Sequence, residues 1–166
     1  FSLGRRAPLS TRRTLHQVNA VGTRNVAQCC AQQDQPPVLV VASSLAAAGP
    51  SNAGHPRTEA DDPDPVSEYG RSKRNGELAA IEFADRVPTT IVRPPIVLGE
   101  ADRDGFTLFE AIAKWGLHAV AGLRDHPFSI IHAEDLANAM MLAADRGRRI
   151  SSSQGDQGTY FAAARE

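Results

Sequence analysis

The sequence has little of what defines several protein classes. Its only two cysteines, Cys29 and Cys30, are adjacent, a spacing that strains a disulfide, so we expect neither a disulfide framework nor a cysteine-based metal site. No apolar run approaches the roughly 20 residues that span a bilayer, and no signal peptide is evident. The formal net charge of -1 lacks the basic excess of nucleic-acid binders. These absences predict a cytoplasmic protein without nucleic-acid or membrane partners and without a metal.

What is present is an ordinary globular composition. Hydrophobic residues make up 42% of the 166 positions and charged residues 22%, enough for one domain with a sizeable core. The chain begins with Phe1 and not with Met, which indicates a piece of a longer protein. Residues 1–13 have four arginines and no hydrophobic period, so we expect an irregular lead-in there and a single domain over 14–166.

Short β-branched runs alternate with helical patterns along that domain. A helical stripe over 14–32 precedes the apolar run 38–42, whose length and flanking prolines predict a strand buried on both faces. The Pro- and Gly-rich stretch 49–66 predicts a long surface loop, and Ser67 is expected to cap a helix over 69–85. This alternation predicts an α/β fold with a mainly parallel sheet. The remaining predicted elements are strands at 89–92, 128–131 and 159–161 and helices at 106–115 and 133–145.

One predicted helix and one strand end carry side chains suited to catalysis. Tyr69 and Lys73 are four residues apart on one helical face, so both can reach one site. A lysine ammonium close to a phenol favours the phenolate, which lets the tyrosine act as a general acid or base. Ser44 follows the predicted strand, at the sheet edge where open α/β folds bind ligands. A Tyr-x-x-x-Lys pair alone is most often an exposed helix pair, so the context decides.

Five segments provide that context, because they follow one another in a recognisable order. They are 18–25, 38–50, Tyr69–Lys73, 90–99 and 129–137. Together they resemble extended short-chain dehydrogenases/reductases, the NAD-dependent epimerase/dehydratase family, whose signature is Tyr-x-x-x-Lys. Within the family, bacterial dihydroflavonol-reductase-like and hydroxysteroid-dehydrogenase-like members have segments most similar to Ser-Ser-Leu-Ala-Ala-Ala-Gly-Pro and Arg-Pro-Pro.

The resemblance implies a fold and an activity. The fold would be a Rossmann-like, doubly wound parallel sheet, with the substrate-binding region starting after about residue 99. The activity would be that of an NAD- or NADP-dependent oxidoreductase or epimerase acting on a small-molecule secondary alcohol or ketone, with the cofactor supplying the hydride chemistry. A homodimer is also implied.

The resemblance further implies four catalytic residues. Ser44 would hydrogen-bond the substrate oxygen, and it is preferred over Ser43 because of its spacing from the next glycine. Tyr69 would transfer the proton, and Lys73 would stabilise its phenolate. Asn19 would help to order the site.

Five residues are implied to contact the cofactor. Tyr69 and Lys73 would face the nicotinamide half, with Lys73 holding the ribose hydroxyls. Pro94, Pro95 and Val97 would border the nicotinamide ring.

The sequence departs from the family pattern in its glycines. None of the 13 glycines falls into the Gly-x-x-Gly-x-x-Gly turn that holds a pyrophosphate at a helix N-terminus. The residue that would choose between NAD and NADP is absent with that turn. We therefore expect an incomplete fold, without the first strands and the phosphate loop, and poor or no dinucleotide binding by this chain.

Two alternatives to the oxidoreductase remain open. A nucleotide-sugar epimerase or dehydratase would share the same catalytic residues, although a dehydratase usually adds an acidic residue where Leu45 and Ala46 stand. A truncated, non-catalytic fragment is the alternative from a different class, and the absent phosphate loop is the feature that favours it.

Overall fold

The structure is a computed structural model that describes residues 9–51, 54–100, 110, 113–114, 128–151 and 157–163. In order along the chain, its helices and strands are α1 (Leu9–His16), the π-helix η1 (Gln17–Val21), α2 (Gly22–Ala31), β1 (Leu39–Ala42), α3 (Leu45–Ala48), α4 (Glu68–Ile81), β2 (Thr89–Arg93), β3 (Ile96–Leu98), β4 (Ile130–His132), α6 (Ala133–Arg146) and β5 (Thr159–Phe161).

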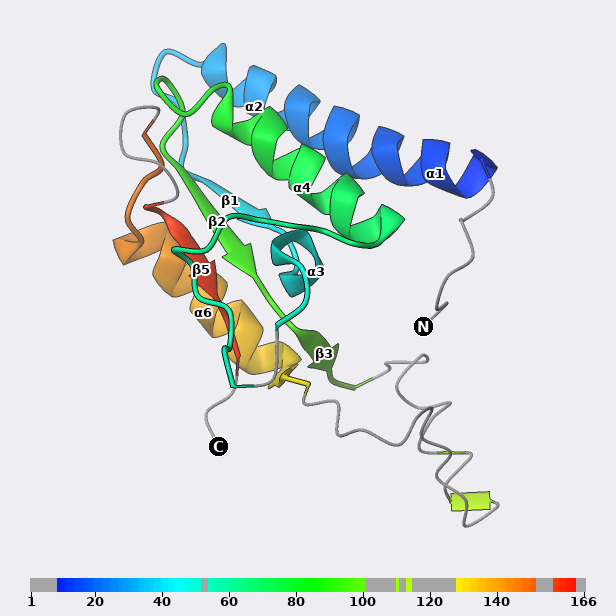
Figure 1. The fold of residues 1–166 in the computed structure, drawn as a ribbon. Coiled ribbons are helices and arrows are strands. Elements are labelled where there is room, and N and C mark those ends of the chain that lie inside the picture. The colour runs from blue at the N-terminus through cyan, green and yellow to red at the C-terminus, as the bar shows by residue number, and fades with distance from the viewer. Residues whose placement is uncertain are drawn as a thin grey trace.

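The strands form two parallel sheets. The larger has the order β1-β2-β5, with Val41 opposite Ile91 and Val92 opposite Tyr160. The smaller joins β3 to β4 and lies beyond the end of β2 (Figure 1). The prediction of an α/β fold with a mainly parallel sheet is confirmed, because each strand pair is parallel and helices lie between β1 and β2 and between β4 and β5.

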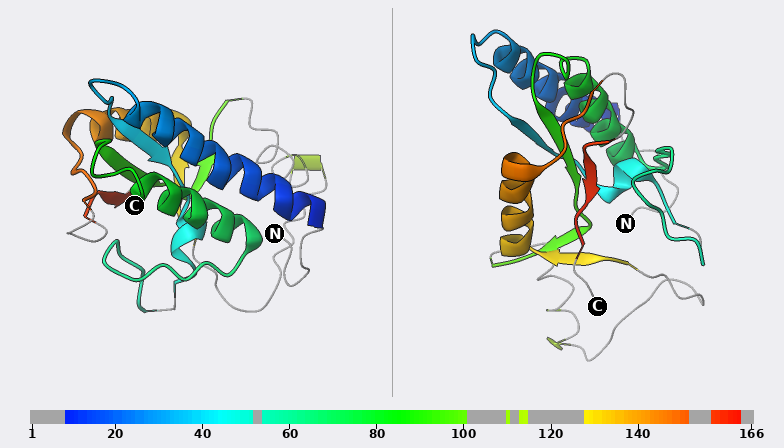
Figure 2. Two further views of the ribbon diagram at one scale, coloured as in Figure 1. Left: turned by 90° about the horizontal axis from the view of Figure 1, so that it is seen from above. Right: turned by 90° about the vertical axis from the view of Figure 1, so that its left-hand side faces the viewer.

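Helices cover both faces of the larger sheet. The α1–α2 helix and α4 lie side by side over one face, and α6 lies over the other (Figures 1 and 2). The two helices run in the same direction, because Arg12 contacts Glu68 at 2.8 Å and Asn19, further along, contacts Ser72 at 2.9 Å. This layering brings the start of α4 to the end of the sheet where β1 ends.

The core lies around β2, the central strand. All five of its residues are buried, and Ile91 packs with Val41, Ala80 and Ile150 in the main hydrophobic cluster. The buried hydroxyl of Thr90 donates to the Arg148 carbonyl at 3.0 Å. This hydrogen bond avoids the cost of burying the Thr90 hydroxyl without a partner.

Several boundaries differ from the sequence-based expectations. Residues 9–13 belong to α1, so the expected irregular lead-in is wrong for them, since the helix continues upstream of the hydrophobic stripe. The helix α3 and the strand β3 were not predicted, because they have only four and three residues and give no periodic pattern in the sequence. Residues 1–8 and most of the expected helix at 106–115 lie outside the described residues.

Candidate active site

The first turn of α4 places Tyr69. Ser67 caps the helix as predicted, because its hydroxyl accepts a hydrogen bond from the Gly70 amide at 2.9 Å. A Cβ on Gly70 would lie 2.2 Å from the Ala46 carbonyl oxygen, so glycine allows α4 to approach α3 this closely. Tyr69 is 45% exposed beside this contact, and its ring is open to a ligand.

Lys73 lies one turn further along α4 and reaches the end of β1. Its ammonium donates to the Ala42 carbonyl at 2.7 Å, which leaves two N–H groups for other partners. Burial lowers the pKa of Lys73, and the charge of Glu77 opposes part of this shift. Lys73 therefore contacts the end of the strand that precedes Ser44, and its catalytic role stays a prediction.

Ser44 sits where β1 gives way to α3. Its backbone is extended (φ -161°, ψ 151°), and its hydroxyl accepts a hydrogen bond from the Ala46 amide at 3.2 Å, which caps α3. The hydroxyl proton remains available to donate to a substrate oxygen. The next amide, that of Leu45, donates to the Pro94 carbonyl at 2.9 Å and ties this turn to the end of β2.

Asn19 lies in the π-helical turn η1, a geometry that is frequent at functional sites. Its side-chain amide donates to the Ser72 hydroxyl at 2.9 Å, and that hydroxyl donates to the Tyr69 carbonyl at 2.7 Å. A Cβ on Gly76 would lie 2.3 Å from the Asn19 carbonyl oxygen, so the two helices touch here. Asn19 thus contacts Ser72, which lies between Tyr69 and Lys73, and its role in ordering the site stays a prediction.

The three residues expected to border the nicotinamide follow β2. Pro94 is buried next to the Ser44 turn, and Pro95 is partly exposed. Val97 lies on β3, opposite Ile131 of the second sheet. The structure therefore brings Pro94 to the site, whereas no described contact joins Val97 to Tyr69 or Lys73, and the cofactor roles stay predictions.

A buried polar network beneath the site was not predicted. The Ser43 hydroxyl donates to Glu77, whose two oxygens accept from Arg93 Nε and Nη2, each at 2.8 Å. Arg74 Nη1 donates to the same carboxylate at 2.9 Å. Glu77 and Arg93 are fully buried, and Ser43 is therefore occupied, which agrees with the choice of Ser44 for the substrate.

The negative charge of Glu77 is compensated by the arginines of this network. Burial alone would raise the pKa of Glu77, but the hydrogen bonds and charge of Arg93, with hydrogen bonds from Ser43 and Arg74, hold it below its usual value. Arg93 also lies over the Phe161 ring, 5.9 Å from its centroid. An arginine at the end of an otherwise apolar strand was the signal in the sequence that could have revealed the network.

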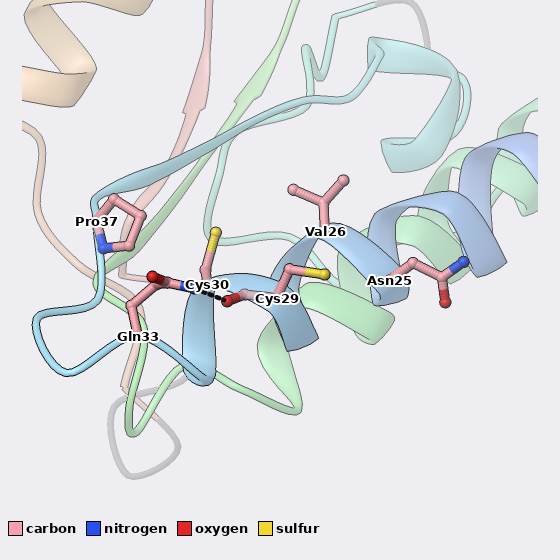
Figure 3. A pocket seen from close by; sticks show the side chains of 6 residues that line it. All are labelled: Asn25, Val26, Cys29, Cys30, Gln33 and Pro37. Atoms are coloured by element: carbon pink, nitrogen blue, oxygen red, sulfur yellow. Dashed lines mark hydrogen bonds between the residues drawn. The ribbon is translucent and has the colours of Figure 1, made fainter.

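A separate pocket lies on the outer side of α2. Its volume is about 380 Å³, and Figure 3 shows Cys29, Cys30 and Pro37 among its lining residues. Gln33 Nε2 donates to the Cys29 carbonyl at 3.1 Å at its rim. None of the predicted site residues lines this pocket, so it carries no part of the expected chemistry. Cys29 is exposed and Cys30 partly exposed, and both thiols are free, as predicted from their adjacent positions in the sequence.

Two further searches concern metals and membranes. Among the described residues, no three His, Cys, Asp or Glu side chains gather as a metal site. His132 instead caps α6 through Nδ1, which accepts from the Glu134 amide at 3.3 Å. None of the helices in the described ranges is long and apolar enough to cross a membrane.

Comparison with known proteins identifies relatives along almost the whole chain. The family model described as "NAD dependent epimerase/dehydratase family" matches residues 4–155. Human 3 beta-hydroxysteroid dehydrogenase type 7 is 28% identical over 173 aligned positions, which cover 95% of this chain and 45% of the human protein.

Solved structures give the same picture. A candidate epimerase from Burkholderia cenocepacia J2315 superposes with a TM-score of 0.72 and 28% identity, over 95% of this chain and 50% of that protein. MoeE5, solved in complex with UDP-glucuronic acid and NAD, superposes with a TM-score of 0.64 and 25% identity, over 86% of this chain and 46% of MoeE5. The chain thus spans about half the length of these relatives.

Proposed function

Since this chain belongs to the NAD dependent epimerase/dehydratase family, we propose that it carries the proton-transfer centre of an NAD(P)-dependent oxidoreductase or epimerase acting on a secondary alcohol or ketone. The observation that carries the proposal is the contact of Lys73 with the Ala42 carbonyl at 2.7 Å. It brings the helix that also bears Tyr69 to the strand end that leads into Ser44. The similarity to a human hydroxysteroid dehydrogenase supports the alcohol or ketone as substrate class.

Each side chain has one task in the proposed reaction. The Ser44 hydroxyl donates a hydrogen bond to the substrate oxygen and orients it. The Tyr69 hydroxyl gives its proton to that oxygen in reduction and accepts it in oxidation. The Lys73 ammonium stabilises the phenolate that Tyr69 becomes, because opposite charges attract strongly at a partly buried site. The nicotinamide, when bound, supplies or accepts the hydride.

The residues present fit one half of a dinucleotide. Lys73 has two N–H groups left and Tyr69 is 45% exposed, and such groups suit the hydroxyls of a ribose. Of the three residues expected to border the ring, Pro95 and Val97 are partly exposed and Pro94 is buried. No glycine-rich turn in the 166 residues suits a diphosphate, so this chain would hold the nicotinamide half alone.

A nucleotide-sugar epimerase is the second candidate. The observation that favours it is the similarity to a candidate epimerase and to MoeE5, the latter solved with UDP-glucuronic acid and NAD. Leu45 and Ala46 after Ser44 favour an epimerase over a dehydratase, because neither side chain can exchange a proton. Assays on ketosteroids and on UDP-sugars, each with NAD and with NADP, would separate the two candidates.

A nuclear magnetic resonance titration of this chain with reduced nicotinamide mononucleotide tests the proposal. We expect weak binding, with chemical-shift changes at Ser44, Tyr69 and Lys73, and loss of those changes in Tyr69→Phe and Lys73→Ala. The chain has only one other tyrosine and one other lysine, so Tyr160→Phe and Lys114→Ala are matched controls that should bind like the original chain. Shift changes confined to another region, or their persistence in both site variants, would reject the proposal and favour the non-catalytic alternative.

The oligomeric state stays a prediction from the family resemblance. Val18 and Val26 on the α1–α2 helix are 65% and 52% exposed, and Leu78 on α4 is 45% exposed. A homodimer through these helices would cover such apolar side chains. Light scattering at several protein concentrations measures whether a dimer forms, and Val26→Asp should weaken it.

A further inference from the structure

The end of β1 is held by two side chains that lie one turn apart on α4. Lys73 donates to the Ala42 carbonyl at 2.7 Å. Glu77, four residues later, accepts a hydrogen bond from the hydroxyl of the next strand residue, Ser43. Because the two contacts bind successive residues, they fix both the distance of α4 from β1 and its position along the strand. Ser44 is the residue that follows directly.

Glu77 also joins this helix to β2. Arg93 Nε and Nη2 donate to its two oxygens at 2.8 Å each, a bidentate geometry that adds directional constraint to the attraction of charges. Both side chains are fully buried. Arg93 precedes Pro94, whose carbonyl accepts from the Leu45 amide at 2.9 Å. One carboxylate therefore connects α4 with the carboxyl ends of both strands that border the site.

We propose that Glu77 is a positioning residue of the site: through Ser43 and Arg93 it holds the helix face of Lys73 at the ends of β1 and β2. The inference rests on the proposed function, because it adds one member to that site. Glu77 itself touches neither substrate nor cofactor and acts through Lys73 and Ser43.

Lys73 and Glu77 are four residues apart on α4, so their charges lie on the same side of the helix. Burial lowers the pKa of Lys73, and the charge of Glu77 opposes part of this shift. The other ionisable side chains on the elements packed around Lys73 are Glu68, Tyr69, Arg71 and Arg74 on α4, Glu82 directly after it, Arg93 on β2, Arg12, Arg13 and His16 on α1, and Arg24, Cys29 and Cys30 on α2, whereas β1, η1 and α3 have none.

The lysine content of the chain makes the test direct. Its only two lysines are Lys73 and Lys114, and the Lys114 side chain is 65% exposed, so Lys114 is an internal reference. A chain labelled with ¹³C-lysine gives one Cε signal for each, and both can be followed against pH. We expect Glu77→Gln to lower the pKa of Lys73 relative to the original chain and to leave Lys114 unchanged. Glu82→Gln removes the same charge from the exposed end of α4 and should leave both signals unchanged.

A folded Glu77→Gln chain whose Lys73 titrates as in the original chain would overturn the inference. Ser43→Ala provides a second test that keeps every charge. There we expect faster hydrogen exchange at the amides of residue 43 and Leu45, which bond to the end of β2, while amides of β5 keep their rates. Unchanged rates at both amides would also overturn it. Neither readout needs a cofactor, so the outcome is independent of the nucleotide titration that tests the proposed function.

Discussion

Glu68 and Glu77 lie on the same helix and each binds two arginines, yet the two clusters occupy opposite environments. Glu68 accepts from Arg12 and Arg71, at 2.8 Å each, with its side chain 20% exposed at the start of α4. Glu77 accepts from Arg93 and Arg74, with its side chain fully buried. Similar contacts thus lie at a partly exposed helix start in one case and inside the protein in the other.

The comparison shows which of the two carboxylates can constrain the candidate site. Hydrogen bonds from Arg71 and Arg12 lower the pKa of Glu68 with little opposition from burial, whereas the pKa of Glu77 falls although burial opposes it. Exposed ion pairs contribute little, because water and salt screen them. A buried charge depends on its partners, and removing one partner is costly. Glu77 therefore constrains the site strongly, and Glu68 only helps to align α1 with α4.

Truncating the buried carboxylate should have the largest effect. Glu77→Ala leaves Arg93 buried without its partner, and we expect a loss of about 3–5 kcal/mol in the free energy of unfolding. Urea unfolding followed by circular dichroism measures it. A loss no larger than that of Glu68→Ala would erase the distinction between the two clusters.

Filling the contact between α4 and α3 should have the next largest effect. In Gly70→Ala the new Cβ would meet the Ala46 carbonyl oxygen at 2.2 Å, so the helix must shift, at a cost of about 1–3 kcal/mol. Gly22→Ala is the matched control, because its nearest neighbour would be 3.6 Å away. That variant should be neutral or stabilised by about 0.5–1 kcal/mol. Equal unfolding midpoints for the two variants would contradict the close packing of α3 on α4.

Lowering the pH should reduce the stability contributions of both glutamates, and the difference between the two should be smaller than in the preceding tests. The pKa of Glu77 in the folded chain lies below its ordinary value of 4.5, so its stabilisation is present above pH 4.5 and is lost as the pH falls through the folded value. Glu68 titrates in the same direction, but added salt should weaken its share. Unfolding midpoints between pH 5 and pH 2.5, in low and in high salt, check this. A pH dependence abolished by salt would assign it to the exposed cluster.

Removing the partly exposed charge of Glu68 should have the smallest effect on stability. Glu68→Gln keeps hydrogen-bonding capacity toward Arg12 and Arg71, so we expect only a slight change in the thermal midpoint. Scanning calorimetry in low salt would detect it. A change as large as that of Glu77→Gln would mean that α1 depends on this contact.

The residues of the candidate site were predicted from local sequence signals. The Ser67 cap, the Tyr69–Lys73 spacing and the strand before Ser44 are features of short segments, and the structure places Lys73 at that strand end. The strand at 159–161 was also predicted, because its residues favour β structure on their own.

The rest could not be predicted, because it depends on contacts between distant segments. The sequence did not pair Glu77 with Arg93, and only the packing of α4 on β2 buries them together. The helix α3 forms where the Leu45 amide binds the Pro94 carbonyl, a contact between segments far apart in the chain. Local propensity contains no information about either pairing.

Calorimetry that compares NADH with reduced nicotinamide mononucleotide tests whether this chain binds only the nicotinamide half of the cofactor. We propose that Tyr69 and Lys73 contact that half and that the chain has no glycine-rich turn for the diphosphate. We therefore expect both compounds to bind weakly, with dissociation constants within a few-fold of each other. NADH binding that is tighter by orders of magnitude would contradict the account, because it would require a diphosphate site that none of the 13 glycines provides.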